Sequence, residues 1–457
     1  MFIESVKTPG IAHLSYVIGN EGKACVIDPQ LDTDTYLSIA GKHNCRITHI
    51  VETHRNEDFI SGALALSNRT QAPVYHGEHA DETVQYASIA RDNDSFEVGK
   101  WLLKVVATPG HTKDSISLAC YDTNQSKTTP IGVFTGDTLF VNDVGRTDFY
   151  PDEKEHMASE LYESLQKLIA LGDQVIVYPA HGAGSVCGGG MADREFTTIG
   201  FEKQYNPLLS VQQKPEFIRQ KVTEHHYISP YFSEMERANV TGVDSPVSDM
   251  VIQPLHEQRV PQWLAESDKP GLLIDVRAHA AFRDSHIPGS LNLPGDLLSA
   301  YGGWLLDYQQ PIAIVAEDKE SARASAKQLW RMGFCNLSGY LTDVPFPLTR
   351  EQQHQHSIDT VTADVVEKRL SEFKEKDWVL LDVRKRDEVE SMAFPGALHT
   401  YLGHLKQYKD KFSADTHYTC MCGSGKRATV AASYLKMLGC THVDVFTGSL
   451  QAWEAHQ

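Results

Sequence analysis

The chain has 457 residues, 42 basic and 60 acidic side chains, and a formal net charge of −18. This length exceeds what one hydrophobic core can organise and predicts about three domains. The acidic balance repels polyphosphate, which argues against nucleic acid as a partner, and no window approaches the roughly 18 uninterrupted apolar residues of a membrane-spanning helix.

The N-terminal segment lacks a charged stretch followed by an apolar core, so we expect no secretory signal. The eight cysteines follow no regular spacing, which argues against a disulfide scaffold. We therefore predict a cytoplasmic protein whose thiols are reduced.

Short apolar segments in the N-terminal half each end in a polar loop. We predict strands at residues 24–28, 47–51 and 174–178, each followed by a loop that carries a candidate site residue. Site residues at strand ends are what an αββα sandwich would provide. Residues 212–248 have helical and turn character, and we interpret them as the connection into the second half.

The polar loops contain four motifs in a fixed order. Residues 53–59 (THRNEDF) resemble the H-x-H-x-D-H signature of the metallo-β-lactamase fold, with Asn56 and Phe59 in place of two histidines. Residues 108–112 (TPGHT), 136–140 (GDTLF) and 178–182 (YPAHG) follow at about the separations at which that fold supplies its other ligands.

Together, His54, His111 and Asp137 provide two imidazoles and one carboxylate. This ligand set is typical of mononuclear non-haem Fe(II) oxygenases. A hydrolase with two zinc ions would need a ligand at Phe59, and a phenyl ring cannot coordinate a metal. We leave Asp58 and His181 outside the ligand set and expect them to hydrogen-bond ligands or water.

Residues 1–245 resemble persulfide dioxygenases of the metallo-β-lactamase superfamily, and the whole chain resembles their fusions with rhodanese domains. The matching segments are residues 144–149 (VGRTDF), 178–188 (YPAHGAGSVCG) and 198–208 (TIGFEKQYNPL). The resemblance implies one Fe(II) per N-terminal domain, held by His54, His111 and Asp137. It also implies that Arg146 binds the tail of the persulfide.

The second half contains an internal repeat. Residues 272–277 (LLIDVR) and 286–290 (HIPGS) recur as residues 380–384 (LLDVR) and 394–397 (FPGA), with one offset of 107 residues. Each copy continues through an apolar segment into an amphipathic helix that ends near a glycine.

Alternating strands and helices of this kind predict an α/β fold with a largely parallel sheet. The two copies resemble rhodanese domains at residues 250–355 and 356–457.

In the second copy, residues 422–427 (CGSGKR) lie between a predicted strand and a predicted helix. Glycine permits unusual φ values, and the helix N-terminus adds positive potential, so a thiolate at Cys422 should be stabilised. The loop resembles the six-residue active-site loop of rhodaneses, whose cysteine carries sulfane sulfur as a persulfide. The residues expected to bind substrate are Gly423, Ser424, Gly425, Lys426 and Arg427.

Three other positions bear on sulfur chemistry. Ala316 aligns with Cys422 and is followed by acidic residues, so we predict an inactive middle domain that serves as a spacer or docking surface. Cys187, in a glycine-rich segment after His181, is a candidate catalytic thiol that accepts or passes on sulfur. Cys420 shares a strand face with Cys422, and we expect it to pack in the core.

We therefore predict a persulfide dioxygenase, coupled to a sulfurtransferase in sulfide detoxification. The N-terminal site would convert a low-molecular-weight persulfide and O2 into sulfite and a thiol, and Cys422 would exchange sulfur with thiosulfate or sulfite. The thiol (glutathione, coenzyme A or similar), the direction of transfer and a homodimeric state stay open. The alternatives are a thiolester hydrolase of the glyoxalase II type, and a sulfurtransferase or persulfide carrier with a non-catalytic N-terminal domain.

Overall fold

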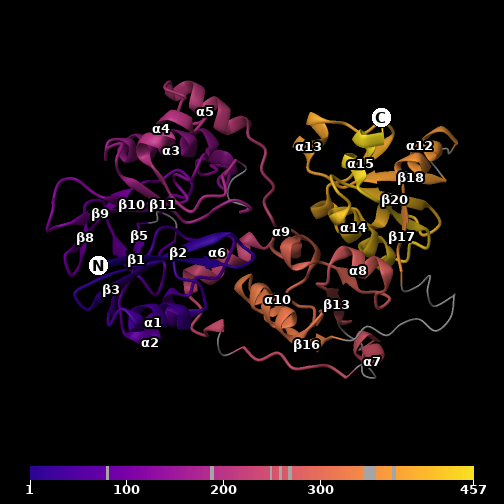
Figure 1. Ribbon diagram of the computed structural model, residues 1–457, viewed down its shortest axis with the longest axis horizontal. Helices are drawn as coiled ribbons and strands as arrows, with labels where there is room; N and C mark the ends of the chain where they lie inside the picture. Colours follow the sequence, from indigo (N-terminus) through magenta and orange to yellow (C-terminus); the bar gives the residue numbers. More distant parts are fainter. Residues whose placement is uncertain are drawn as a thin grey trace. The chain divides into compact units, whose positions relative to one another are not determined.

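The structure is a computed structural model that describes residues 1–78, 82–185, 190–247, 250–256, 260–265, 270–342, 357–372 and 377–456 (Figure 1). The chain forms two compact units. The first contains residues 1–250, and the second contains most of the residues from 251 onward.

The first unit begins with a six-stranded sheet in the order β1-β2-β3-β4-β5-β6. Its first three strands are antiparallel, and β3 to β6 are parallel, with helices crossing over between β3, β4 and β5 as parallel pairing requires. The strands are β1 (Phe2–Thr8), β2 (His13–Asn20), β3 (Lys23–Ile27), β4 (Arg46–Glu52), β5 (Val74–Gly77) and β6 (Ser88–Ala90).

A second six-stranded sheet has the order β12-β11-β10-β9-β8-β7. It is antiparallel except where β10 pairs with β11. The strands are β7 (Ser95–Val98), β8 (Trp101–Ala107), β9 (Ile116–Asp122), β10 (Gly132–Gly136), β11 (Ile176–Pro179) and β12 (Thr197–Thr198).

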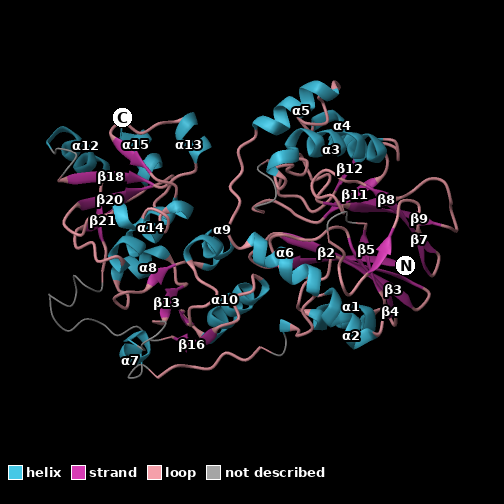
Figure 2. Cartoon of the chain, turned by 180° about the vertical axis from the view of Figure 1, so that it is seen from behind, coloured by secondary structure: helices cyan, strands magenta, loops and turns pink. Residues whose placement is uncertain are grey.

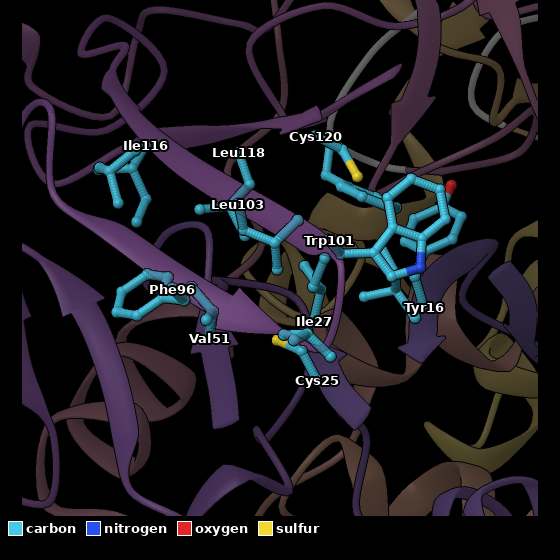
Figure 3. Packing of buried hydrophobic residues seen from close by; sticks show 14 of the residues in the cluster. Tyr16, Cys25, Ile27, Val51, Phe96, Trp101, Leu103, Ile116, Leu118 and Cys120 are labelled. Atoms are coloured by element: carbon cyan, nitrogen blue, oxygen red, sulfur yellow. The ribbon is translucent and has the colours of Figure 1, made fainter. Parts of the chain in front are cut away.

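The main core of this unit lies between the two sheets (Figure 3). Strand β3 is apolar at successive positions because both of its faces are covered. Cys25 and Ile27 face the second sheet, whereas Ala24 and Val26 pack with residues of the helices on the outer face. Successive side chains of a strand point to opposite faces, so a strand covered on both sides is apolar throughout.

Helices cover the outer faces of both sheets, with α1 and α2 on one side of the strands and α3, α4 and α5 on the other (Figure 1). Helix α3 buries Leu161, Leu165 and Leu168, a spacing that places them on one helical face. The helices are α1 (Thr33–Lys42), α2 (Ala63–Thr70), α3 (Lys154–Ile169), α4 (Ile199–Tyr205), α5 (Lys214–Thr223) and α6 (Phe232–Thr241). The predicted αββα sandwich is confirmed.

The second unit contains two parallel sheets. The first has the order β14-β13-β15-β16. Its strands are β13 (Leu272–Asp275), β14 (Leu291–Asn292), β15 (Ile312–Val315) and β16 (Leu337–Leu341). Its helices are α7 (Val260–Ala265), α8 (His279–Asp284), α9 (Gly295–Leu305) and α10 (Lys319–Arg331).

The other sheet has the order β17-β21-β20-β18-β19, of which Figure 2 labels β18, β20 and β21. Without its edge strand β17, this order matches that of the preceding sheet strand for strand, which confirms the predicted repeat. The strands are β17 (Asp359–Val361), β18 (Trp378–Asp382), β19 (Ala397–His399), β20 (His417–Met421) and β21 (Val443–Phe446). The helices are α12 (Ala363–Glu372), α13 (Arg386–Ser391), α14 (Lys426–Met437) and α15 (Ser449–His456).

The predicted domain boundaries stay predictions, because residues 248–249 and 343–356 lie outside the described residues. Within the described ranges, none of the helices is both long and apolar enough to cross a lipid bilayer.

Candidate metal centre and cysteine loop

The three predicted metal ligands meet at one edge of the first unit. His54 follows the end of β4, His111 lies between β8 and β9, and Asp137 directly follows β10. One ligand atom from each residue lies within 4.8 Å of the others, and all three residues are buried. Strand ends from both sheets therefore bring together residues that are far apart in the chain.

Hydrogen bonds fix which nitrogen of each imidazole is available. Thr53 donates its hydroxyl hydrogen to Asp28 Oδ2 over 2.8 Å, so its oxygen accepts from His54 Nδ1 at 3.0 Å. His111 Nδ1 lies 3.0 Å from the carbonyl oxygen of Arg146, which only accepts. Both imidazoles thus carry hydrogen on Nδ1 and present the lone pair of Nε2 to the centre.

The buried ligand atoms fit a metal cation. Within the described residues, His54 Nε2, His111 Nε2 and Asp137 Oδ2 make no hydrogen bond. The aspartate oxygen lies 3.8 Å from the first nitrogen and 3.5 Å from the second. Buried polar atoms without partners are costly, and a metal bound between these three atoms would satisfy all of them.

His181 links the carboxylate of Asp137 to that of Asp58. His181 Nδ1 lies 2.7 Å from Asp137 Oδ1, and His181 Nε2 lies 3.1 Å from Asp58 Oδ2, both within hydrogen-bonding distance. Burial alone would lower the pKa of His181, but the two carboxylates raise it above its usual value. The imidazole of His181 therefore contacts the Asp137 carboxylate, in the hydrogen-bonding role predicted for it.

Asn56 and Phe59, which replace two histidines of the H-x-H-x-D-H signature, are both buried. Phe59 is fully buried, and its ring centroid lies 4.1 Å from that of His13. The Asn56 amide is turned toward its own loop, where it donates to the carbonyl oxygen of His54 at 3.4 Å. A phenyl ring cannot coordinate a metal, which agrees with a mononuclear centre.

Arg146 is near the centre but engaged elsewhere. Its guanidinium donates to both carboxylate oxygens of Asp148 at 2.7 and 2.8 Å and lies over the Phe149 ring at 4.7 Å. The Phe149 ring in turn lies 5.2 Å from that of His111. The role of Arg146 in substrate binding stays a prediction, and it would require a change in this pairing. Cys187 lies outside the described residues.

Glu57 is a residue at the centre that the sequence analysis missed. It is 2% exposed, and its Oε1 lies 3.2 Å from His111 Nε2, while its Oε2 lies 3.9 Å from His54 Nε2. The available signal was an ionisable residue at a position that the H-x-H-x-D-H pattern leaves unspecified.

The Cys422 loop follows β20 and leads into α14. Cys422 is 1% exposed, and its sulfur accepts a hydrogen bond from the Gly425 amide at 3.1 Å. Gly425 has φ +99°, a left-handed conformation that favours glycine, whereas Gly423 is not among the residues with positive φ. The Cys422 amide donates to Ser449 Oγ at 3.0 Å, which ties the loop to the start of α15.

The basic residues of this loop are paired with carboxylates. Arg427 donates from both terminal nitrogens to Glu388 of α13, at 2.5 and 2.6 Å. Lys426 lies 2.9 Å from Asp296 of the preceding repeat, with both side chains about half exposed. Ser424 is exposed at the rim of the loop. Binding of an anion by these residues stays a prediction.

The middle repeat contacts this loop without offering a thiol of its own. Ala316 follows β15 at the position equivalent to Cys422 and is fully buried. Tyr301 of α9 forms a side-chain hydrogen bond with Arg427.

Comparison with known proteins agrees with this architecture. The Metallo-beta-lactamase superfamily profile matches residues 8–181, and the Rhodanese-like domain profile matches residues 260–343 and 362–456. A crystal structure of a metallo-beta-lactamase from Staphylococcus aureus subsp. aureus COL shares 28% identity with a TM-score of 0.67, over 74% of this chain and 98% of that chain.

Two curated relatives match parts of the chain. The mitochondrial persulfide dioxygenase ETHE1 of Bos taurus is 27% identical over 214 residues, 45% of this chain and 74% of its own length. An uncharacterized protein of Mycobacterium leprae is 34% identical over 140 residues, 30% of this chain, and the match spans about half (54%) of that protein. The chain therefore joins an N-terminal domain of the metallo-β-lactamase superfamily to two rhodanese-like domains, and it is a homologue of the persulfide dioxygenases.

Proposed function

We propose that the N-terminal domain is a mononuclear iron dioxygenase for low-molecular-weight persulfides and that Cys422 transfers sulfane sulfur. The proposal for the N-terminal domain rests on one observation: ligand atoms of His54, His111 and Asp137 lie within 4.8 Å of one another. Two imidazoles and one carboxylate form the donor set of non-haem Fe(II) oxygenases. The similarity to a named persulfide dioxygenase supports the substrate class.

A ferrous ion held there would supply the redox chemistry that joins O2 to the terminal sulfur. One persulfide, one O2 and one water give one thiol, one sulfite and two protons, and the four electrons lost by sulfur reduce the O2. The chain supplies orientation. Thr53 and the Arg146 carbonyl hold the imidazoles, His181 holds Asp137, and Phe59 offers no ligand to a second ion.

The Cys422 thiolate would attack the sulfane sulfur of thiosulfate. The sulfur–sulfur bond of thiosulfate breaks, sulfite leaves with the electron pair, and the cysteine becomes a persulfide. The Gly425 amide, which already donates to the sulfur, and the N-terminus of α14 stabilise the anion in both states. A thiol such as glutathione or coenzyme A would accept the sulfur, and the same steps reversed would make thiosulfate.

The test is O2 uptake with a glutathione or coenzyme A persulfide, using protein loaded anaerobically with Fe(II). We expect uptake with sulfite formation by wild type and by Cys422→Ser, and loss of uptake in His111→Ala. Thiosulfate sulfurtransfer should show the opposite pattern, so each variant is the folding control for the other.

Two outcomes would replace the proposal. Stoichiometric zinc with thiolester hydrolysis and no O2 uptake would identify a hydrolase of the glyoxalase II type. Sulfurtransfer without O2 uptake, equal in wild type and His111→Ala, would leave a sulfur carrier with a non-catalytic N-terminal domain.

A further inference from the structure

We propose that Glu57 is a fourth protein ligand of the metal, so that this centre has two imidazoles and two carboxylates. The inference rests on the metal site of the proposed function but not on its oxygen chemistry or its substrate. It distinguishes this chain from the three-residue ligand set that its motifs predict.

The first support is geometric. Each of the two Nε2 atoms lies near two carboxylates. His111 Nε2 is 3.5 Å from Asp137 Oδ2 and 3.2 Å from Glu57 Oε1, and His54 Nε2 is 3.8 Å from Asp137 Oδ2 and 3.9 Å from Glu57 Oε2. With metal–ligand bonds of about 2.1 Å, neighbouring ligand atoms lie roughly 3.0 Å apart in an octahedron and roughly 3.4 Å apart in a tetrahedron. One oxygen of Glu57 therefore approaches His111 Nε2 and the other approaches His54 Nε2, each at a distance close to that of Asp137 Oδ2.

The second support is the way the loop is held. Asn239 of α6 donates from its side-chain amide to the carbonyl oxygens of Asn56 at 2.6 Å and Phe59 at 2.8 Å, on either side of Glu57. Its own oxygen accepts from the Ser61 amide at 2.8 Å. On the other flank, the Arg55 amide donates to Asp114 at 2.9 Å. These bonds fix the backbone that carries Glu57, as ligand positioning requires.

The third support is burial. The Glu57 carboxylate lies among buried ligand atoms, where a charge is retained only when it is paired or coordinates a metal. Two carboxylates also balance the charge of a divalent ion, whereas Asp137 alone leaves a net positive centre. Four protein ligands leave an octahedral ion two open positions instead of three, and the neutral centre should bind small anions less tightly.

The test compares metal binding by the full-length wild type, Glu57→Ala and Glu57→Gln, measured anaerobically with Fe(II) and Co(II). If Glu57 is a ligand, both variants should lose more than about 100-fold in metal affinity, because residues outside the ligand set already cost about 10–100-fold. The visible absorption bands of bound Co(II) should change, and azide should bind more tightly to the Glu57→Ala centre.

Glu82→Ala is the matched control, because Glu82 is exposed and pairs with Arg55 in the same loop. His111→Ala gives the reference for a lost ligand, and the unfolding temperature of each metal-free protein checks the fold. Unchanged Co(II) bands in Glu57→Ala, or an affinity within about tenfold of wild type, would overturn the inference. Wild type that binds metal through Glu57 but takes up no O2 would defeat only the proposed function.

Discussion

The hydrogen-bond chain from Asp28 through Thr53 to His54 sets the tautomer of a metal ligand. The Thr53 hydroxyl must donate to Asp28, so it accepts from the imidazole. A valine has the same shape as threonine but neither donates nor accepts. The imidazole would then be free to rotate or to place its hydrogen on the coordinating nitrogen.

Thr53→Val should therefore lower Fe(II) affinity by about 10–100-fold while leaving the metal-free fold intact. Competition with a coloured chelator under anaerobic conditions measures the affinity. Thr48→Val is the matched control, since Thr48 lies in the same strand and contacts His49, which is not in the site. Equal losses in both variants would show a general effect on β4.

At this scale the sequence predicted the ligand triad because each member sits in a recognisable motif at a strand end. It did not predict Glu57, because the direction of a loop side chain depends on Asn239, which lies 182 residues further along the chain. The pairing of Arg427 with Glu388 was not predicted for the same reason. The two residues lie on different helices, so no fixed spacing in the sequence connects them.

We expect helix α9 of the middle repeat to position the Cys422 loop, a role beyond the spacer or docking surface that the sequence predicts. Its Tyr301 bonds the loop arginine, and its Asp296 pairs with the loop lysine. The repeated strand order was predictable from the 107-residue offset, because hydrophobic strands and Pro-Gly turns recur in register. The contacts of α9 with the other repeat carried no such pattern.

Removing the Tyr301 hydroxyl tests this role. We expect Tyr301→Phe to raise the KM for thiosulfate about fivefold with little change in kcat, because a hydrogen bond contributes about 1 kcal/mol. Tyr308→Phe is the control, since Tyr308 stacks on Phe334 in the same repeat. A steady-state assay measures both constants. If the KM for thiosulfate of both variants matched that of wild type, Tyr301 would have no part in substrate binding.

For the whole molecule, the net charge of −18 opposes every anionic substrate of the proposed reactions. The loop cations Lys426 and Arg427 are offset by Asp296 and Glu388, so local attraction is weak. The long-range field should therefore decide how association depends on salt.

We expect kcat/KM for thiosulfate to rise at least about twofold as ionic strength increases from about 0.02 to 0.2 M, because screening shortens the reach of the repulsion. Stopped-flow or steady-state assays in potassium chloride measure it, with an uncharged thiol acceptor held at saturation. A fall in kcat/KM would mean that the loop cations dominate despite their partners.

The buried Phe59 ring, which packs against His13, has a consequence for how the protein is loaded with metal. A hydrolytic centre with two zinc ions would need a ligand at position 59, and a phenyl ring offers none. We therefore expect the N-terminal domain to take up one zinc ion, and not two, when the protein is incubated with excess zinc.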